Sequence, residues 1–426
     1  AWRLSSESFF QNIPFVNDLK LRAGYGSLGN QETGNFLFLS RVLTSSDYAF
    51  GSGNGNAVGN VQLGAALPDF PVRDLTWEIS RTTNVGIDGI AWNNRLNFTI
   101  EYYNRLTSGI LQQVPLPAAA GIQNQPVLNV ASVRNSGVEL ALGYNQTVGD
   151  FSFNVSANLT TVRNRVESVF RDAPTGGEFG RIEEGFPINY IWGYQVGGIF
   201  QTQAEIDAWR ARYTDANIGQ NKTNPAAGYQ YKPGDMWFSD VNGAPAAGQV
   251  RNPTPDSLIN ANDRTYLGKT IPGFFYGINL GASYKGIDLS LFFQGVGDVQ
   301  AINNARWRGE SMNGRGVNQW ASTLDRWTPE NPSTTMPRAA FQDPAQNTRF
   351  SSRWVESAAF MRLKNIQLGY TLPKPLLNRL GFIENLRIYA AATNLLTFTR
   401  WTGLDPEERG GIPPTRVVNL GLNATF

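Results

Sequence analysis

The sequence contains no cysteine and no histidine among its 426 residues. These absences exclude disulfides, thiol nucleophiles, Ser-His-Asp triads and His-ligated zinc or iron sites. Acid–base catalysis by carboxylates alone would need a distinctive pair of Asp or Glu residues, and no such pair stands out. We therefore do not expect the chain to be an enzyme.

Charged residues are also scarce, at 16% of the chain against about 25% in ordinary globular proteins. The net charge of +2 gives no reason to expect nucleic acid as a partner. No run approaches the roughly 18 consecutive apolar residues that a membrane helix needs. Glycine (44 residues) and aromatic residues (12%) are abundant instead. This composition fits a β-barrel, in which every second residue faces a polar lumen.

The end of the chain, residues 416–426, alternates between apolar and small or polar residues. Because successive side chains of a strand point to opposite faces, the apolar residues share one face: Val418, Leu420, Leu422, Ala424 and Phe426. A strand that alternates in this way and ends on an aromatic residue is typical of outer-membrane β-barrels. The closing strand of a soluble sandwich gives the same alternation and is the alternative.

Nine further segments repeat this two-faced pattern, and each comes close, alone or with its flanks, to the roughly nine to eleven residues of a membrane-crossing strand. They are residues 19–25, 84–91, 96–102, 138–145, 151–160, 276–284, 287–293, 366–370 and 386–392. We therefore predict an all-β fold, a transmembrane antiparallel β-barrel to which this chain contributes ten strands.

The connections between these strands alternate in length. Short turns rich in Asn, Asp and Gly are predicted at residues 92–95, 148–151 and 284–287, with a slightly longer link at 373–382. Long loops are predicted at residues 28–76, 106–130, 167–271, 298–358 and 399–415. Short turns at one end and long loops at the other are typical of outer-membrane barrels, whose long loops are extracellular. The carboxyl terminus is then expected on the periplasmic side.

The long loops contain recognisable local signals. Residues 201–213 predict a short amphipathic helix capped by Thr202, with Glu205 at the capping-box spacing. Two interpretations of the loop tryptophans compete: a platform for sugar faces or peptide side chains, or packing within the loops and the interfacial belt. Packing is favoured for any single ring, and we predict none as a ligand contact. The tryptophans on or beside the loops are Trp192, Trp209, Trp237, Trp307, Trp320, Trp327, Trp354 and Trp401.

Several segments closely resemble the SusC/RagA-like branch of TonB-dependent outer-membrane transporters, in the order of that family and almost from end to end of the chain. They are LKLRAGYG (19–26), LTWE (75–78) leading to NVGID (84–88), VRNSGVE (133–139), GFFYG (273–277), FMRLKNI (360–366) through GYTLP (369–373), and NLLTF (394–398) with GLDPE (403–407).

The resemblance implies that residues 1–426 are the carboxyl-terminal part of one barrel domain, comprising the last ten strands of about 22. Residues 1–9 read like the tail of a strand, and the plug and the TonB-contacting segment would lie upstream of Ala1. Ten strands alone would leave two unpaired edges, which a membrane penalises.

The same resemblance implies active import across the bacterial outer membrane, of oligosaccharides or peptides, energised by the TonB complex. A SusD-like surface lipoprotein would close over the extracellular loops, and two transporter–lipoprotein pairs would form a dimer. Outer-membrane lipid would surround the wall. A passive or gated porin without a plug is one alternative, and an outer-membrane adhesin or hydrolase is another, although the missing histidine argues against common hydrolase chemistry.

The family's Asp-x-Asn-x-Asp-Gly loop resembles the oxygen spacing that Ca²⁺ prefers. Here Asp240 and Asn242 keep the first two oxygens, the third is lost, and Asp263 follows an insertion. The resemblance implies these three residues as candidate calcium ligands, with Asp256 or backbone carbonyls completing the shell. A turn stabilised by Asx hydrogen bonds, without a cation, is the alternative. No other cofactor is expected.

Overall fold

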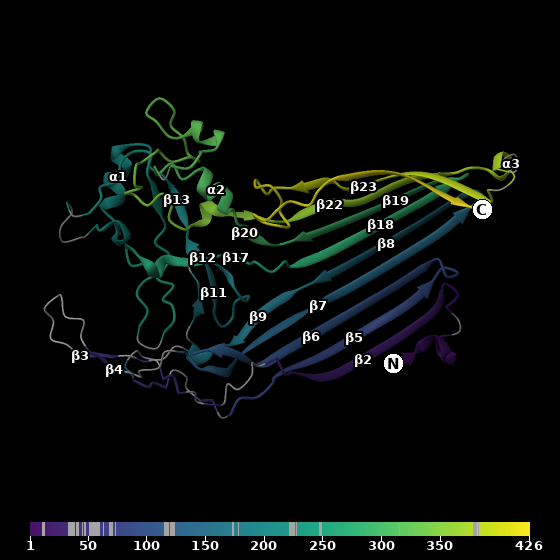
Figure 1. Cartoon of the computed structure of the whole chain (residues 1–426), viewed down its shortest axis with the longest axis horizontal. Helices are drawn as coiled ribbons and strands as arrows, with labels where there is room; N and C mark the ends of the chain where they lie inside the picture. The colour runs from purple at the N-terminus through teal and green to yellow at the C-terminus, as the bar shows by residue number, and fades with distance from the viewer. Residues whose placement is uncertain are drawn as a thin grey trace.

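Ten long antiparallel strands form a single curved sheet, here called the wall, in a computed structural model of the chain (Figure 1). The structure describes residues 1–426 apart from 11–12, 33–38, 40–41, 45, 47, 51–59, 63, 68–70, 73, 115–118, 120–123, 173, 178, 221–225, 227, 247–248, 315, 378–380 and 382. All ten predicted strands are confirmed, with these bounds: β2 Val16–Asn30, β5 Glu78–Ala91, β6 Leu96–Gln113, β7 Val127–Val148, β8 Phe151–Thr161, β18 Phe274–Tyr284, β19 Ile287–Gly297, β22 Phe360–Thr371, β23 Asn385–Thr399 and β24 Val417–Thr425.

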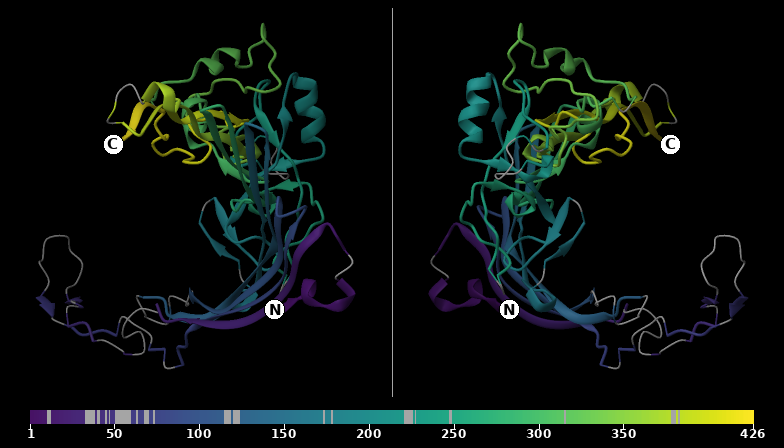
Figure 2. Two further views of the ribbon diagram at one scale, coloured as in Figure 1. Left: turned by 90° about the vertical axis from the view of Figure 1, so that its right-hand side faces the viewer. Right: turned by 90° about the vertical axis from the view of Figure 1, so that its left-hand side faces the viewer.

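Every wall strand pairs with the next wall strand along the chain, from β2 to β24. Viewed from the side of the short turns or of the loops, the wall curves between edges formed by the amino-terminal and carboxyl-terminal segments (Figure 2). The wall stays open within the described part of the chain. At one edge only a two-residue strand, β1 (Trp2–Arg3), pairs with β2. The predicted strand tail at residues 1–9 is therefore this short strand, followed by the 3-10 turns η1 (Leu4–Ser6) and η2 (Ser8–Phe10).

The predicted short turns are confirmed at one end of the wall. Between β18 and β19, Lys285 and Gly286 have φ angles of 46° and 86°, the left-handed pair of a type I′ hairpin. Asn93 and Asn94 have φ angles of 56° and 66° in the β5–β6 turn, which asparagine tolerates well. The longer link at 373–382 begins with the helix α3 (Lys374–Leu377), and part of it lies outside the described residues. No described helix is long and apolar enough to cross a membrane.

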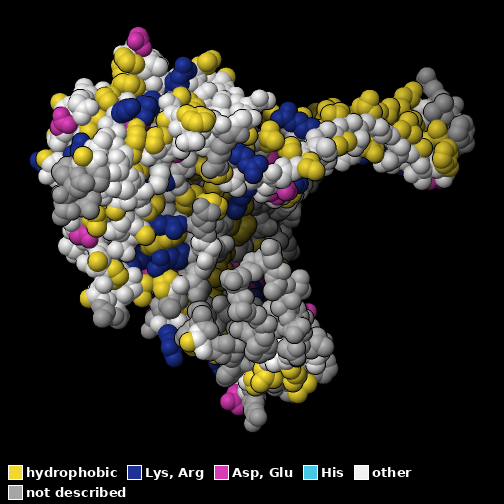
Figure 3. All heavy atoms as spheres, turned by 60° about the vertical axis from the view of Figure 1, so that its left-hand side comes forward, with side chains coloured by type: hydrophobic (Ala, Val, Ile, Leu, Met, Phe, Trp, Pro, Cys, Tyr) yellow, Lys and Arg dark blue, Asp and Glu magenta, His cyan; other side chains and the backbone are white. Residues whose placement is uncertain are grey.

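One face of the wall is apolar and points away from the rest of the protein. On β24 the exposed fractions of Val418, Leu420 and Leu422 are 71%, 85% and 60%, and Figure 3 shows apolar side chains along the projecting wall. Contiguous exposed apolar surface of this kind marks contact with lipid or protein. The predicted alternation of faces is therefore present in the fold.

Glycines on the polar face leave room for side chains of the neighbouring strand. Asn154 on β8 lies directly opposite Gly281 on β18, and Asn158 lies opposite Gly277. A Cβ atom at Gly281 would lie 2.1 Å from the Asn154 side-chain oxygen, and one at Gly277 would lie 2.7 Å from that of Asn158. The two amide side chains therefore lie across strand positions that a larger residue would obstruct.

The long loops gather at the other end of the wall and contain smaller elements (Figure 1). One four-stranded sheet contains β10 (Thr175–Gly176), β11 (Gly180–Ile182), β12 (Tyr190–Tyr194) and β17 (Arg264–Gly268). Three two-stranded sheets are formed by β13 (Val196–Ile199) with β15 (Met236–Phe238), β14 (Thr214–Asp215) with β16 (Leu258–Ile259), and β20 (Gln300–Ile302) with β21 (Val355–Ser357). In the first long loop β3 (Tyr48–Phe50) pairs with β4 (Asn60–Gln62), and β9 (Arg163–Ser168) pairs with β7.

Two loops, residues 162–273 and 298–359, fold together around a hydrophobic core of their own, and we call them the loop module. The core contains Ile199, Phe200, Ile206, Trp209, Ile218, Tyr231, Met236, Phe238, Ile259 and Ala345. A second small cluster joins residues of the loop module to the last loop: Val299, Ala301, Ala358 and Trp401. The loop module therefore has a hydrophobic core of its own, as a small domain does.

The predicted helix is confirmed as α1 (Gln203–Arg210), with its cap on Thr202. The Thr202 hydroxyl accepts the Glu205 backbone N–H at 3.2 Å. The Glu205 carboxylate accepts the backbone N–H of Gln201 at 2.7 Å, one residue before the cap. The capping-box spacing is therefore used, with its returning bond shifted by one residue.

Candidate functional site

Charged side chains on the polar face of the wall pair across several strands. Arg22 on β2 bonds Asp88 on β5 at 3.1 Å and also pairs with Glu101 on β6. Arg387 on β23 binds Asp288 on β19 at 2.5 Å. These pairs join two or three strands of the wall, so several charges on the face that would line a lumen are paired with one another.

A tighter group of charges, here called the mouth cluster, lies where the wall meets the loops. Arg362 on β22 is 1% exposed and binds Asp405 at 2.5 Å and Glu407 at 2.8 Å. Lys364 lies 3.8 Å from Glu407. Two segments that sequence resemblance singled out, FMRLKNI and GLDPE, therefore meet through an ion-pair network, which fixes the last loop against the wall.

Buried ion pairs also hold the two halves of the loop module together. Arg349 binds the fully buried Asp215 at 2.9 Å, and Arg338 binds the fully buried Asp235 at 2.6 Å. Tyr229 donates its hydroxyl to Asp235 at 2.9 Å. Burial, together with the Asp235 charge, raises the pKa of Tyr229 to about 12.

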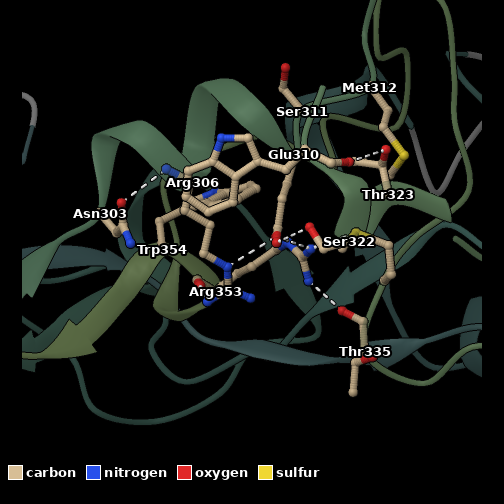
Figure 4. Close-up of polar contacts among 12 residues, drawn as sticks. Asn303, Arg306, Glu310, Ser311, Met312, Ser322, Thr323, Thr335, Arg353 and Trp354 are labelled. Atoms are coloured by element: carbon tan, nitrogen blue, oxygen red, sulfur yellow. Dashed lines mark hydrogen bonds and ion pairs between the residues drawn. The ribbon is translucent and has the colours of Figure 1, made fainter. Parts of the chain in front are cut away.

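A third network surrounds the helix α2 (Asn304–Gly309) and is drawn in Figure 4. The Glu310 carboxylate forms ion pairs with Arg306 at 3.0 Å and with Arg353 at 2.9 Å. The Asn303 side chain caps the helix by accepting the Arg306 backbone N–H. Burial lowers the pKa of Arg353 to about 10, although Glu310 opposes the shift. A buried guanidinium needs a carboxylate partner, and Glu310 supplies it while also binding Arg306 of α2.

The last loop is fixed to the same network through Glu356. Its carboxylate accepts the Thr402 backbone N–H at 3.0 Å, the Asn303 amide at 3.2 Å and Arg306 at 3.0 Å. Burial alone would raise the pKa of Glu356, but these hydrogen bonds outweigh it and lower the pKa. Glu356 is therefore charged at neutral pH and connects three chain segments.

The structure places the candidate calcium residues in one turn, where backbone N–H groups donate to the carboxylates of Asp240 and Asp263. Asp240 accepts the Ser257 N–H at 2.6 Å. The fully buried Asp263 accepts the N–H groups of Val241 at 2.9 Å and Asn242 at 3.1 Å. The Asn242 nitrogen donates to the Asn262 carbonyl at 2.9 Å. Burial raises the pKa of Asp263, and the nearby Asp240 adds to the shift.

These bonds are those of an Asx-stabilised turn. Across the described residues, no group of three or more His, Cys, Asp or Glu side chains is placed to hold a metal ion. Bound calcium at Asp240, Asn242 and Asp263 stays a prediction.

Four of the eight loop tryptophans are buried and the other four are half-buried. Trp192, Trp209, Trp354 and Trp401 are buried, so the packing interpretation holds for these four. Trp307 and the buried Trp354 both line a cavity in the loop module. The sequence indicated where aromatic residues concentrate but not which ring would face a cavity, because that depends on contacts between loops far apart in the chain.

The wall, its one-sided turns and its folded loops define the class of outer-membrane β-barrel proteins. The family model described as TonB dependent receptor-like, beta-barrel matches residues 2–395, and the chain belongs to that family. The structure is similar to that of the RagAB peptide transporter, with a TM-score of 0.75 and 27% identity, over 100% of this chain and 42% of that one.

Curated relatives agree with this assignment. TonB-dependent receptor P39 of Formosa agariphila is 31% identical over 467 residues, covering 100% of this chain and 42% of the relative. TonB-dependent receptor SusC of Bacteroides thetaiotaomicron is 25% identical over 436 residues, covering 100% of this chain and 39% of the relative. The chain thus spans about two-fifths of the length of the curated relatives it matches. These relatives are receptors and transporters, not enzymes.

Proposed function

We propose that this chain forms part of the barrel of an outer-membrane importer that is energised by TonB. The wall supplies the passage, and no covalent chemistry takes place in it. The loop module and the last loop lie outside the cell, and the carboxyl terminus lies in the periplasm. The imported substrate is an oligosaccharide or a peptide.

The observation that carries the proposal is the asymmetry of the wall. Every short turn lies at one end, and at the other end the loops form a module with its own hydrophobic core and buried ion pairs. A passive pore needs only a polar lumen. A folded module over the opening provides a rigid surface for binding substrate and for receiving a SusD-like lipoprotein as a lid, which agrees with the family to which the chain belongs.

Uptake in cells with and without TonB tests this function. The full-length protein is expressed with its neighbouring lipoprotein, and accumulation of labelled oligosaccharides and of labelled peptides is measured. We expect accumulation of one class to fall to background when TonB is deleted, because the family couples transport to TonB. Unchanged accumulation would instead identify a porin, and surface binding without accumulation would identify an adhesin.

A further inference from the structure

The outward face of the wall becomes basic where strands β5, β6, β7 and β9 approach the loops (Figure 1). The strand register places residues of neighbouring strands in rows across the sheet, and every second residue of a strand points outward. The last apolar row on this face contains Ala23, Val85, Tyr102 and Val138. Three of these side chains are largely exposed and belong to the apolar face of the wall: Val85, Tyr102 and Val138.

The next two outward rows, here called the arginine rows, are polar. Two residues farther along the strands, the register aligns Tyr25, Thr83, Asn104, Ser136 and Arg163. After two more residues it aligns Ser27, Arg81, Leu106, Arg134 and Arg165. The two rows therefore contain four arginines and no carboxylate.

Hydrogen bonds of the side chains agree with this outward direction. The Arg134 guanidinium donates to the side-chain oxygen of Asn104, within the arginine rows, at 3.2 Å. The Arg81 guanidinium donates to the hydroxyl of Ser108, two residues beyond Leu106 on β6, at 3.5 Å. Both arginines thus lie on the side of the wall that carries the apolar row, not on the side that would line the lumen.

Most of the positive charge in the arginine rows is not neutralised by the protein. Arg134 binds Glu167 at 2.7 Å. Arg81, Arg163 and Arg165 are exposed, and none of them has an ion pair among the residues that the structure describes. Neighbouring strands lie about 4.8 Å apart, so guanidinium groups crowd together here and repel one another. An anion bound between them would remove that repulsion.

The height of the arginine rows matches that of lipid headgroups. Two and four residues correspond to about 7 and 14 Å along a strand, and to less in height because barrel strands tilt. Headgroups begin where the apolar band of the wall ends. An arginine side chain can also reach back toward that boundary, with its apolar stem covering apolar surface.

We propose that the arginine rows bind the phosphates of glycolipids in the outer leaflet of the outer membrane. The guanidinium fork matches phosphate oxygens bidentately. The acyl chains of the same lipid pack on the apolar row beneath. A soluble acidic protein would contact only the charges, whereas a lipid also covers the apolar face that continues below them. The inference goes beyond import, and it rests on the proposed orientation in which the loops are extracellular.

The test is titration of the purified full-length transporter, in complex with its lipoprotein, in micelles of a neutral detergent. The probe is a fluorescent lipid A that carries two phosphates, and binding is measured by anisotropy. Parallel probes are dephosphorylated lipid A, phosphatidylglycerol and a decapeptide of glutamate. We expect the phosphorylated lipid A to bind most tightly, and its affinity to fall as salt is added.

Two variants test the residues. The combined Arg81→Gln, Arg163→Gln and Arg165→Gln variant should weaken binding at least roughly tenfold, because each basic residue near an anionic lipid surface contributes about fivefold to affinity. Glu167→Gln should strengthen binding by up to about fivefold, because it leaves Arg134 without its protein partner.

A matched control removes three exposed arginines elsewhere, by Arg105→Gln, Arg212→Gln and Arg308→Gln together. Arg105 points to the polar face of the wall, where it donates to Thr82 at 3.2 Å, and the other two lie in the loop module. The control should leave lipid binding unchanged. All six arginines are exposed, so both triple variants should fold, and the heat-resistant form of the barrel on an electrophoresis gel would verify this.

Several results would overturn the inference. They are equal binding of lipid A with and without phosphates, equal losses in the two triple variants, and no gain of affinity in Glu167→Gln. Preference for the glutamate decapeptide would identify an acidic protein as the partner instead, and preference for phosphatidylglycerol would place these residues in the other leaflet. Uptake is a separate readout: TonB-dependent uptake without lipid A binding removes this inference alone, and lipid A binding without TonB-dependent uptake removes only the energised function.

Discussion

Single arginines join chain segments that are distant in the sequence. Arg362 in the mouth cluster, Arg349 in the loop module and Arg22 on the wall each bind a carboxylate from another segment. A buried charge that loses its partner is strongly destabilising. Arg362 therefore fixes the last loop to the wall and Arg349 joins the two loops of the module, while the more exposed Arg22 joins wall strands. The effect can be measured one residue at a time.

Arg362→Met should destabilise the protein by about 3–5 kcal/mol, because it leaves Asp405 and Glu407 without their buried cation. The measurement is the unfolding temperature, together with protease cleavage within residues 400–416. Arg3→Met is the control, because Arg3 is 64% exposed in its pair with Asp18 and exposed pairs contribute little. Equal losses in the two variants would contradict this role for Arg362.

Acid should selectively loosen the last loop through Glu356. The pKa of this carboxyl is lowered in the folded state from its ordinary value of 4.5, so its stabilising contribution is present above that value. The contribution is lost as the pH falls through the lowered pKa. The difference in unfolding temperature between the native protein and Glu356→Gln should therefore shrink below about pH 4.5. A difference that does not change between pH 7 and pH 3 would refute this assignment.

At the scale of elements, the crossover from β8 to β9 depends on one glycine. Strand β7 pairs with β8 through residues 139–148 and with β9 through residues 132–136. Gly137 lies between the two registers, where a Cβ atom would be 1.9 Å from the Thr161 carbonyl oxygen. Tyr103 donates its hydroxyl to that same carbonyl at 2.9 Å. Steric crowding therefore explains why glycine stands at position 137, in the VRNSGVE segment.

Gly137→Ala should destabilise the wall by about 1–3 kcal/mol, because a backbone atom must move to admit the methyl group. The measurement is the temperature at which the purified barrel loses its heat-resistant folded form on an electrophoresis gel. Gly24→Ala on β2 should be near neutral, since nothing lies within 4 Å of a Cβ atom there. A neutral Gly137→Ala variant would show that the crossover is not tightly packed.

The alternating segments predicted every wall strand but not the full length of several of them. For β7 the alternation predicts residues 138–145, whereas the strand runs over Val127–Val148, and residues 132–136 of its first half pair with β9. That half does not separate apolar from polar faces, since it packs in the small cluster of Val133, Val166 and Val169. The turns were predictable because Asn, Asp and Gly carry the left-handed angles locally.

At the scale of the whole molecule, the sequence did not predict that the two loops of the module share a core. That core joins residues as distant as Phe200 and Ala345, and no local pattern reveals that contact. For the same reason the cavity beside Trp307 could not be predicted, although the aromatic content of the loops was evident. The candidate calcium residues show the reverse case: the resemblance suggests ligands, and the fold uses the carboxylates of Asp240 and Asp263 to accept backbone N–H groups.

The central claim is that alternate residues of the wall face lipid and an aqueous lumen. These 426 residues contain no cysteine, so a cysteine introduced in them is the only one in this part of the protein. A spin label is attached to single cysteines introduced into the full-length protein in place of Val418, Leu420, Leu422, Asn419 and Asn423. In outer-membrane vesicles, the collision rate of each label with oxygen is compared with its collision rate with a water-soluble nickel chelate.

We expect oxygen, which concentrates in lipid, to dominate at positions 418, 420 and 422. The nickel chelate should dominate at positions 419 and 423. Equal accessibility at odd and even positions would contradict the barrel interpretation of the whole chain.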